Sequence, residues 1–306
     1  MGNLLLQKFK LICEDPRYVY YSFQAFFTNP YSRGFLRRIE RLFFKGRPKA
    51  IASIKNPNQK DKFDSLLKDG IAINPVSIDK GNIRTIRQCL GELLCHDPEN
   101  PDLGHFKVSE RPIGAKRAYY QCEEIGKIPG VLEIGNDPKI LDYVSRYFGV
   151  LPILDSVYAW WSFPHSEKTH TQAYHRDVDT LHQLKFFVYL TDVDEDCGPH
   201  VYIKKSKNSS FKTKKDNAHK DSEIEAHFPE EDRLIIVGES GFNFVGDMFS
   251  FHKGMVPAKT PRLVLQFLYS LVRTTFGPKN AFIRKDEIDI SELGDHYQEV
   301  NKYLIV

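Results

Sequence analysis

The sequence has no long apolar run, few cysteines and little net charge, and each of these features excludes a class of protein. No apolar stretch is long enough to span a bilayer, so we expect no transmembrane helix. The formal net charge is only +3, which does not call for a nucleic-acid partner. The cysteines are odd in number and irregularly spaced, which favours free thiols in a reducing compartment: Cys13, Cys89, Cys95, Cys122 and Cys197. Because the first residues also lack a signal-peptide pattern, we expect a cytoplasmic protein.

The order of the sequence patterns predicts helices first and strands later. Helical patterns end at Gly70 and at Gly149, and a short strand is expected at 71–78. After residue 150, short apolar runs alternate with Gly, Asp and Pro turns, which is typical of a β-sandwich or barrel. The expected strands are 154–163, 183–191, 201–204, 233–237, 248–252 and 262–272, and a last helix is expected at 290–302. The fold class predicted is therefore mainly β with helical flanks (α+β). We divide the chain into a basic helical segment (1–56), a core domain (57–280) and a helical tail (281–306).

Residues 31–49 form a basic amphipathic pattern. Phe35, Ile39 and Leu42 recur at helical spacing, and arginines and lysines occupy the other positions. The favoured interpretation is a helix whose apolar stripe packs on the main domain while its arginines face solvent. The alternative is peripheral contact with an anionic membrane surface.

Residues 204–220 hold seven lysines among Ser, Asn and Asp. Such a segment is too polar for a core, and a solvated loop between strands is the favoured interpretation. A mobile lid that attracts an anionic substrate is the alternative.

The most informative motif is His175-Arg176-Asp177, with His252 and Arg262 further along the chain. In an extended segment, residues two apart point to the same side, so His175 and Asp177 can reach one ion. His252 can complete a set of two imidazoles and one carboxylate, which leaves positions open for non-heme Fe(II) and O2 chemistry. Arg262 adds a planar cation that can grip a carboxylate, and a β-hairpin is expected to bring it beside the metal. This combination is what a 2-oxoglutarate-dependent oxygenase needs.

Two other sets of residues compete for the metal. His219-Lys220-Asp221 has the same spacing but lies in the lysine-rich segment, where no apolar strand would hold it. Asp179 and His182 lie near the first motif, and we expect them at the surface or behind the ligands.

At these residues the chain resembles the phytanoyl-CoA dioxygenase family over roughly residues 65 to 275. The resemblance rests on Lys68-Asp69-Gly70, on Gly135-Asn136-Asp137-Pro138, on Tyr174-His175-Arg176-Asp177, and on the stretch from Leu184 to Asp194 followed by Gly198-Pro199. Gly246-Asp247, His252 and Arg262 complete it. One departure is that the strand after the glycine turn, which begins His200-Val201-Tyr202, lacks the usual Gly-Ser-His ending.

The resemblance implies a double-stranded β-helix (jelly-roll) core with N-terminal helices. It implies Fe(II) held by His175, Asp177 and His252, and 2-oxoglutarate held by Arg262, with Phe187 lining the cosubstrate pocket. O2 is the third reactant. Asp177 is present, whereas halogenating relatives lack this carboxylate, so hydroxylation or desaturation is favoured over halogenation. Hydroxylation of an unactivated C–H bond with release of succinate and CO2 is the expected reaction, and desaturation is the alternative.

Two other functions stay open. A cupin-type metal isomerase or epimerase could use the same three ligands without O2, although it would not require Arg262. A jelly-roll that only binds a ligand or partner is the other alternative. The substrate is expected to be a small or conjugated metabolite such as an acyl, sugar or lipid-linked compound, anionic if the basic segments contact it. Trp160, Trp161, Tyr158, Tyr189 and Lys185 are candidate pocket residues, with core packing as the alternative for the aromatic ones. No feature predicts the oligomeric state.

Overall fold

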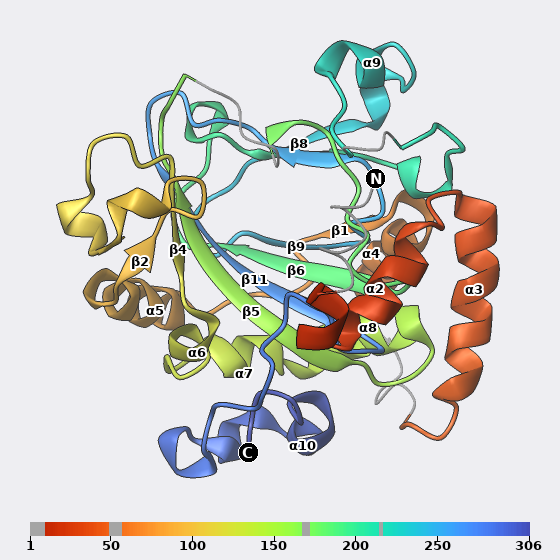
Figure 1. Ribbon diagram of the computed structural model, residues 1–306, viewed down its shortest axis with the longest axis horizontal. Helices are drawn as coiled ribbons and strands as arrows, with labels where there is room; N and C mark the ends of the chain where they lie inside the picture. Colours follow the sequence, from red (N-terminus) through yellow and green to blue (C-terminus); the bar gives the residue numbers. More distant parts are fainter. Residues whose placement is uncertain (1–9, 49–56, 167–171, 214–216) are drawn as a thin grey trace.

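The computed structural model describes residues 10–48, 57–166, 172–213 and 217–306 of the 306-residue chain. Two antiparallel sheets form its core (Figure 1). Within these ranges, no helix is both long and apolar enough to cross a membrane.

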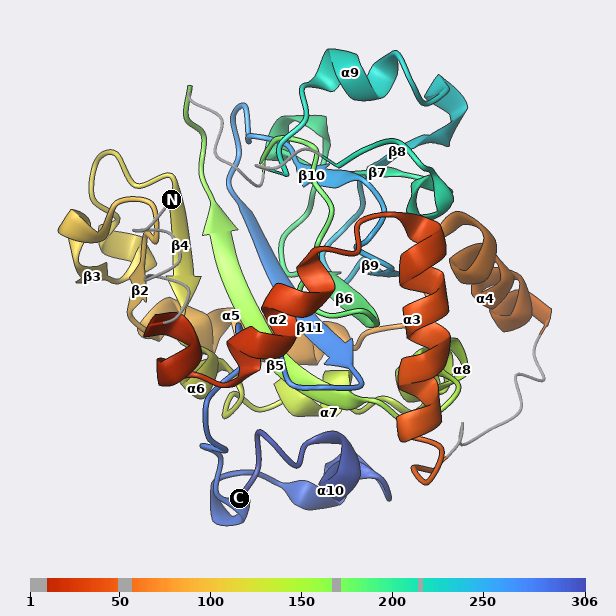
Figure 2. The same cartoon turned by 45° about the vertical axis from the view of Figure 1, so that its right-hand side comes forward.

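The larger sheet has eight strands, and every neighbouring pair in it is antiparallel. In spatial order the strands are β1 (Ile71–Ile73), β9 (Asn243–Gly246), β6 (Gln183–Tyr189), β11 (Arg262–Ser270), β5 (Ile153–Ser162), β4 (Arg117–Tyr120), β2 (Cys95–His96) and β3 (His105–Phe106). The smaller sheet has the order β10 (His252–Gly254), β7 (His200–Ile203) and β8 (Arg233–Ile236). Figure 2 shows the smaller sheet above one end of the larger one. This architecture confirms the predicted β-core with helical flanks.

Alternation along the strands gives the larger sheet two buried faces. On β6, Leu184, Phe186 and Val188 belong to the outer core, whereas Phe187 and Tyr189 belong to a second core that includes Tyr202 of the smaller sheet. The helices within residues 57–148 and the last helix of the chain contribute to the outer core, and the second core fills the space between the sheets. The site described below lies beside that second core.

The helices are the elements that the sequence defines best. They are α2 (Arg17–Ala25), α3 (Pro30–Phe43), α4 (Pro57–Asp69), α5 (Lys80–Glu92), α6 (Cys122–Ile125), α7 (Val131–Gly135), α8 (Pro138–Phe148), α9 (Asp221–Glu225) and α10 (Tyr297–Val300). The Asp137 carboxylate caps α8 by accepting hydrogen bonds from two backbone N–H groups, and Gly149 ends the helix at φ 79°. Residue types with strong local preferences thus set the helix boundaries.

Several predicted strands and helices have different bounds in the structure. The apolar run at 248–251 was expected to be a strand, but it is a fully buried turn, and the strand begins only at His252. The strand before it, β9, was missed because Gly246-Asp247 indicated a turn. The strand expected at 71–78 ends at Ile73, and the helix expected at 290–302 is a 3-10 turn (Ile290–Leu293) followed by the short α10.

The buried and exposed faces of helix α3 are the reverse of those in the favoured interpretation. Arg33 is buried, and its guanidinium lies 4.4 Å from the Phe249 ring centroid. Arg37 forms an ion pair with the buried Asp247. Phe35 and Leu42, which were expected to pack on the main domain, are exposed. The arginines turn inward because Asp247 and main-chain carbonyls accept their hydrogen bonds, as the Arg33 bond to the Thr180 oxygen illustrates.

The start of the lysine-rich segment is also packed rather than solvated. Ser206 and Lys207 are buried, and the Lys207 ammonium donates to the Leu66 carbonyl oxygen at 3.2 Å. It also lies 5.4 Å from the Tyr147 ring centroid. Residues 214–216 of this segment lie outside the described ranges.

Candidate metal centre

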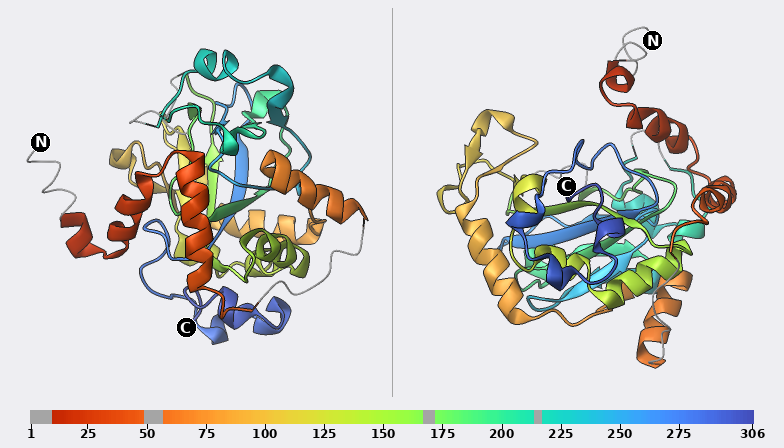
Figure 3. Two further views of the ribbon diagram at one scale, coloured as in Figure 1. Left: turned by 90° about the vertical axis from the view of Figure 1, so that its right-hand side faces the viewer. Right: turned by 90° about the horizontal axis from the view of Figure 1, so that it is seen from below.

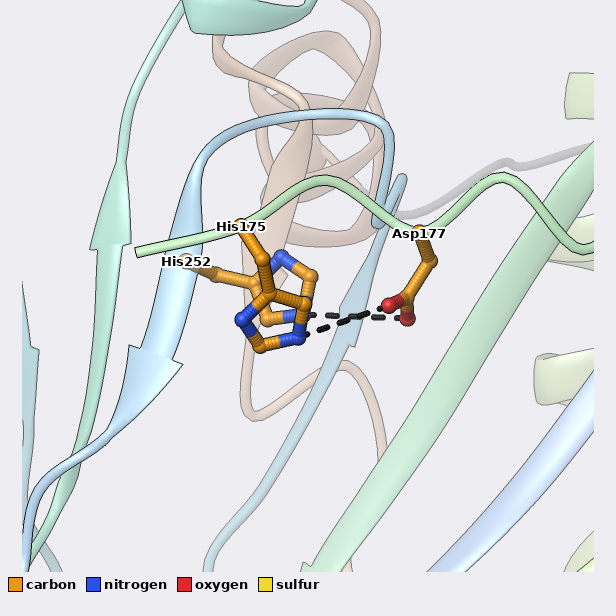
Figure 4. A group of neighbouring side chains, drawn as sticks. All are labelled: His175, Asp177 and His252. Carbon is orange, nitrogen blue, oxygen red and sulfur yellow. Dashed lines mark ion pairs between the residues drawn. The ribbon is translucent and has the colours of Figure 1, made fainter. Parts of the chain in front are cut away.

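The ligand motif is held against the edge of the smaller sheet. His175 and His252 exchange two backbone hydrogen bonds, of 3.0 and 3.1 Å, and the Asp177 N–H donates to the Met248 carbonyl oxygen at 2.7 Å. The segment from 175 to 177 is therefore extended and tied to the turn that precedes β10. This pairing places His175 and His252 side by side (Figure 4).

Arg176 fixes the orientation of this segment. Its guanidinium points away from the two ligand side chains and donates to the carbonyl oxygens of Ser206 and Ser209 at 2.7 and 3.0 Å. It also lies 4.2 Å from the Phe251 ring centroid. With residue 176 anchored on one side, residues 175 and 177 both face the other side.

Three side chains bring their ligand atoms within 4.8 Å of one another: His175, Asp177 and His252. The His175 Nε2 lies 3.5 Å from Asp177 Oδ1, and the His252 Nε2 lies 3.7 Å from Asp177 Oδ2. The two imidazole rings are 4.4 Å apart between centroids. Figure 4 shows both Nε2 atoms directed toward the carboxylate.

Each imidazole has its proton placed by a carbonyl group. His175 Nδ1 lies 2.9 Å from the Ala173 oxygen, and His252 Nδ1 lies 3.0 Å from the Ser250 oxygen. Because a carbonyl only accepts, each Nδ1 carries the proton and each Nε2 presents its lone pair to the centre. Burial, together with the neighbouring His175, lowers the pKa of His252 to about 4. His252 is therefore neutral near pH 7, which is the form that binds a metal.

Asp177 is ionised although it is largely buried. Burial alone would raise the pKa of Asp177, but the ammonium of Lys185 and the neighbouring His252 and His175 together outweigh this effect and hold the pKa well below its usual range. Lys185 Nζ lies 2.6 Å from Asp177 Oδ2 and 3.2 Å from Asp179 Oδ2. The other Asp177 oxygen, Oδ1, is the one nearer His175. Two imidazole nitrogens and an ionised carboxylate form the mixed N/O set that divalent first-row metals accept.

The competing residues have other partners. His219 packs between the rings of Phe211 and Phe251, and Asp221 forms an ion pair of 2.7 Å with Lys253. His182 Nδ1 lies 2.8 Å from a Glu40 carboxylate oxygen. Asp179 lines the cavity and forms an ion pair with Lys185. Within the described parts of the chain, only the 175/177/252 set is close enough to share one ion.

The triad lies at the wall of a cavity of about 550 Å³ between the two sheets. Arg262 and Phe187 both line this cavity, as do Lys185 and Tyr158. The Arg262 side chain is buried and donates to the Gly198 carbonyl oxygen. Arg262 was expected in a hairpin with the strand of His252, but β10 and β11 belong to different sheets. The ligands and Arg262 therefore reach one cavity from its two opposite walls.

Two predicted pocket residues lie elsewhere. Trp161 is on the opposite face of β5, where its indole N–H donates to the Tyr120 hydroxyl at 3.1 Å, and its neighbour Trp160 lines the cavity instead. Tyr189 is fully buried behind the cavity and donates to the Ile236 carbonyl oxygen. Adjacent aromatic residues on a strand point to opposite faces, and the sequence does not show which face each one takes.

His200 is a cavity residue whose role the sequence did not indicate. Its ring lies 4.8 Å from Phe187 and 6.3 Å from His252 between centroids. Among the described residues, none forms a hydrogen bond with its Nδ1, although the side chain is buried. Burial and the nearby Arg262 hold the pKa of His200 well below its usual range, so the ring is neutral. The only sequence signal for His200 was its position directly after Gly198-Pro199. It begins the strand that departs from the family pattern.

Part of the cavity wall is aromatic. Tyr119 and Trp160 are stacked at 5.3 Å with an interplanar angle of 5°. Tyr21 of α2 and Phe276 contact each other edge to face and also line the cavity. A cavity of this size, in which aromatic rings lie beside convergent polar groups, is typical of small-molecule binding.

Comparisons with known proteins support the fold. No family model matches the chain, and a search of curated proteins found no match. Solved structures do resemble it. The epimerase SnoN in complex with Fe3+, alpha ketoglutarate and nogalamycin RO matches with a TM-score of 0.51 and 16% identity, over 78% of this chain and 89% of that one. EctD from S. alaskensis with 2-oxoglutarate and 5-hydroxyectoine matches with a TM-score of 0.51 and 12% identity, over 74% and 81%.

The chain shares the jelly-roll fold of both enzymes. At this level of identity the likeness concerns the fold alone. The resemblance to the phytanoyl-CoA dioxygenase family remains an expectation, since no family model matches.

Proposed function

We propose that this protein is an Fe(II)- and 2-oxoglutarate-dependent oxygenase. The main observation behind this proposal is that the triad His175, Asp177 and His252 lines the same cavity as the Arg262 side chain. The two enzymes that share the fold were solved with 2-oxoglutarate, one of them also with Fe3+, and this supports the same cofactor choice here.

The three ligands fit a divalent iron ion. They supply two imidazole nitrogens and one anionic oxygen, and such a set would leave coordination positions open for other ligands. When bound, iron with 2-oxoglutarate and O2 supplies an oxidant strong enough to attack an unactivated C–H bond. The proposed overall reaction converts substrate, O2 and 2-oxoglutarate into hydroxylated product, succinate and CO2.

Arg262, Phe187 and His200 would form the cosubstrate end of the cavity. Arg262 would hold the far carboxylate of 2-oxoglutarate, because its guanidinium is a fixed fork of donors already oriented by Gly198. Phe187 provides an apolar wall and is stacked on Phe244 at 4.8 Å. His200 lies near both Phe187 and His252 and offers a neutral ring nitrogen for hydrogen bonding.

Lys185 and Asp179 would position Asp177. The ammonium of Lys185 bridges the two carboxylates and restricts the rotation of Asp177. Tyr21 and Phe276 reduce access of water to the far side of the cavity. Burial strengthens these interactions because the local dielectric is low.

The aromatic wall supports a small-molecule substrate with an apolar or ring-shaped part. Arg117 also lines the cavity, although it is paired with Glu99. A conjugated substrate whose ring rests on Trp160 is consistent with these contacts. Hydroxylation is the proposed outcome, and Asp177 supports it over halogenation.

A cupin-type metal isomerase or epimerase is the second candidate. SnoN is an epimerase with the same fold, but it was solved with Fe3+ and alpha ketoglutarate, so it does not support an epimerase that works without this cosubstrate. The position of Arg262 in the cavity favours a dicarboxylate cosubstrate, which an O2-independent isomerase would not need. A binding protein without activity would likewise not need Arg262 in that position.

The decisive experiment is an anaerobic titration of metal-free protein with Fe(II) and 2-oxoglutarate. We expect a visible charge-transfer band only when both are added. Asp177→Ala should abolish the band, and Arg262→Ala should shift its appearance to higher 2-oxoglutarate concentrations.

The matched control is Asp221→Ala, which removes the carboxylate of the competing motif. Since Asp221 pairs with Lys253 and lies outside the triad, this variant should keep the band. Tight metal binding without a band, in the presence of 2-oxoglutarate, would favour the isomerase or the binding protein.

A further inference from the structure

Helix α3 has an apolar stripe that faces solvent. Tyr31, Phe35 and Leu42 are 78%, 63% and 57% exposed. With Arg38 they follow the i, i+4, i+7, i+11 spacing of a single helix face. A row of large exposed apolar residues marks an interaction surface far more often than isolated ones do.

The preceding helix continues this pattern. In α2, Val19 and Phe23 are exposed, and Phe26 follows directly after the helix with 79% exposure. These three residues also follow i, i+4, i+7 spacing. We call the outward residues Val19, Phe23, Phe26, Tyr31, Phe35, Arg38 and Leu42 the outer face of α2–α3. Figures 2 and 3 show that both helices lie at the surface of the molecule.

The inner side of α3 fixes this orientation. Arg33 and Arg37 anchor it on the turn that precedes β10, through Phe249 and Asp247. Glu40 is buried against His182. Rotating the helix to bury Phe35 would expose these ion pairs and leave Asp247 without its partner. The apolar exposure is therefore built into the fold.

The charges on these helices have one sign. Glu40 is the only acidic residue of α3, and it is buried, while α2 has none. Exposed basic residues are Arg38, Arg41 and Lys45. Aromatic and aliphatic residues next to cations are complementary to a bilayer with anionic headgroups.

We propose that the outer face of α2–α3 docks on an anionic lipid bilayer. A second copy of the chain is disfavoured, because a two-fold interface would bring the same surface of two chains together and so place two cationic faces against each other. An acidic partner protein would match the cations, but it would not need a stripe of aromatic residues along two consecutive helices.

Docking would place the cavity beside the membrane. Tyr21, on the side of α2 opposite Val19 and Phe23, lines the cavity, and Gln24 donates to the Val178 carbonyl oxygen next to the metal motif. One helix thus contributes to both the outer face and the wall of the site. A substrate that partitions into the interface would enter close to its binding site.

The test is co-sedimentation of the full-length protein with vesicles of phosphatidylcholine containing roughly 30% phosphatidylserine. We expect binding that weakens at high salt and on pure phosphatidylcholine vesicles. The triple variant Tyr31→Ser, Phe35→Ser, Leu42→Ser should reduce the partition coefficient by more than about tenfold, because three exposed apolar contacts are lost. Arg38→Glu should reduce it by at least about fivefold.

Matched controls separate this surface from general stickiness. Ile113→Ser removes a fully exposed apolar residue elsewhere, and Lys80→Glu reverses an exposed charge on α5; both variants should bind like the wild type. Thermal unfolding should show that the triple variant is folded. No vesicle binding, binding unaffected by the triple variant, or dissociation of a dimer caused by that variant would each overturn the proposal. All vesicle-binding measurements use metal-free protein, so their result is independent of the proposed activity.

Discussion

Arg262 combines a main-chain anchor with a cavity-facing guanidinium. One terminal nitrogen donates to Gly198, and Nε has no partner among the described residues. A Cβ added at Gly254 would come within 3.0 Å of its other terminal nitrogen, which shows how closely β10 approaches it. This geometry suits a planar fork and not a flexible ammonium.

Arg262→Lys is therefore expected to weaken 2-oxoglutarate binding although it keeps the positive charge. Loss of the fork should raise the 2-oxoglutarate dissociation constant by roughly tenfold or more, since charged hydrogen bonds contribute about 1.5–3 kcal/mol. The charge-transfer band gives the titration. The control is Arg273→Lys. The Arg273 guanidinium contacts the carbonyl oxygens of residues 278 and 279 and the Tyr303 ring. An unchanged constant in Arg262→Lys would remove Arg262 from the cosubstrate site.

His200 offers a test of whether a buried polar atom serves a ligand. His200→Phe keeps a ring between Phe187 and Phe244 and removes a nitrogen that has no partner among the described residues. We expect the free energy of unfolding to stay equal or to rise by about 1–3 kcal/mol. Affinity for 2-oxoglutarate should nevertheless fall, or the charge-transfer band should shift. Equal affinity and an equal band would reduce His200 to a packing residue.

At the scale of elements, the ends of α4 and α8 followed from local chemistry, whereas the directions of side chains did not. Asp137 and Gly149 mark the ends of α8 in the sequence, because caps depend on neighbouring residues only. The inward turn of the α3 arginines depends on Asp247, which lies 210 residues away from Arg37. Trp160 and Trp161 illustrate the same limit, since alternation predicts opposite faces without saying which is inside. The approach of the His175 and Asp177 side chains could be predicted because the spacing within their motif restricts its geometry.

The Arg37–Asp247 pair joins α3 to the turn that presents His252. Asp247 also accepts from the Phe249 N–H at 3.1 Å and from the Tyr147 hydroxyl. Arg37→Met would leave a buried carboxylate without its cation and should cost about 3–5 kcal/mol. Arg38→Met, on the exposed side of the same helix, should cost less than about 0.5 kcal/mol. Urea unfolding of the two variants measures the difference, and equal midpoints would contradict the role of the pair.

The same pair gives the stability a defined dependence on pH. Burial would raise the pKa of Asp247, but Arg37 and Lys207 outweigh it and hold the pKa well below its usual range. A depressed folded-state pKa contributes stability above the unfolded value of about 3.9 and loses it as the pH falls further. The wild type should therefore lose stability between about pH 5 and lower pH more steeply than Asp247→Asn does. Parallel pH profiles of the two proteins would show that Asp247 does not carry this effect.

At the scale of the whole molecule, the cavity is built from both sheets. His252 begins β10 of the smaller sheet, and His175 is paired to it, whereas Arg262 begins β11 of the larger sheet. A dicarboxylate held at one end by a metal and at the other by Arg262 would link the two sheets.

Ligands that bind only the folded state raise its stability by about 2.7 kcal/mol at a hundredfold excess over the dissociation constant. We expect Mn(II), a redox-inert probe, to raise the unfolding temperature, and 2-oxoglutarate to raise it further only when the metal is present. Asp177→Ala should lose both shifts and Arg262→Ala only the second; a shift by 2-oxoglutarate alone in wild type would place its site away from the metal.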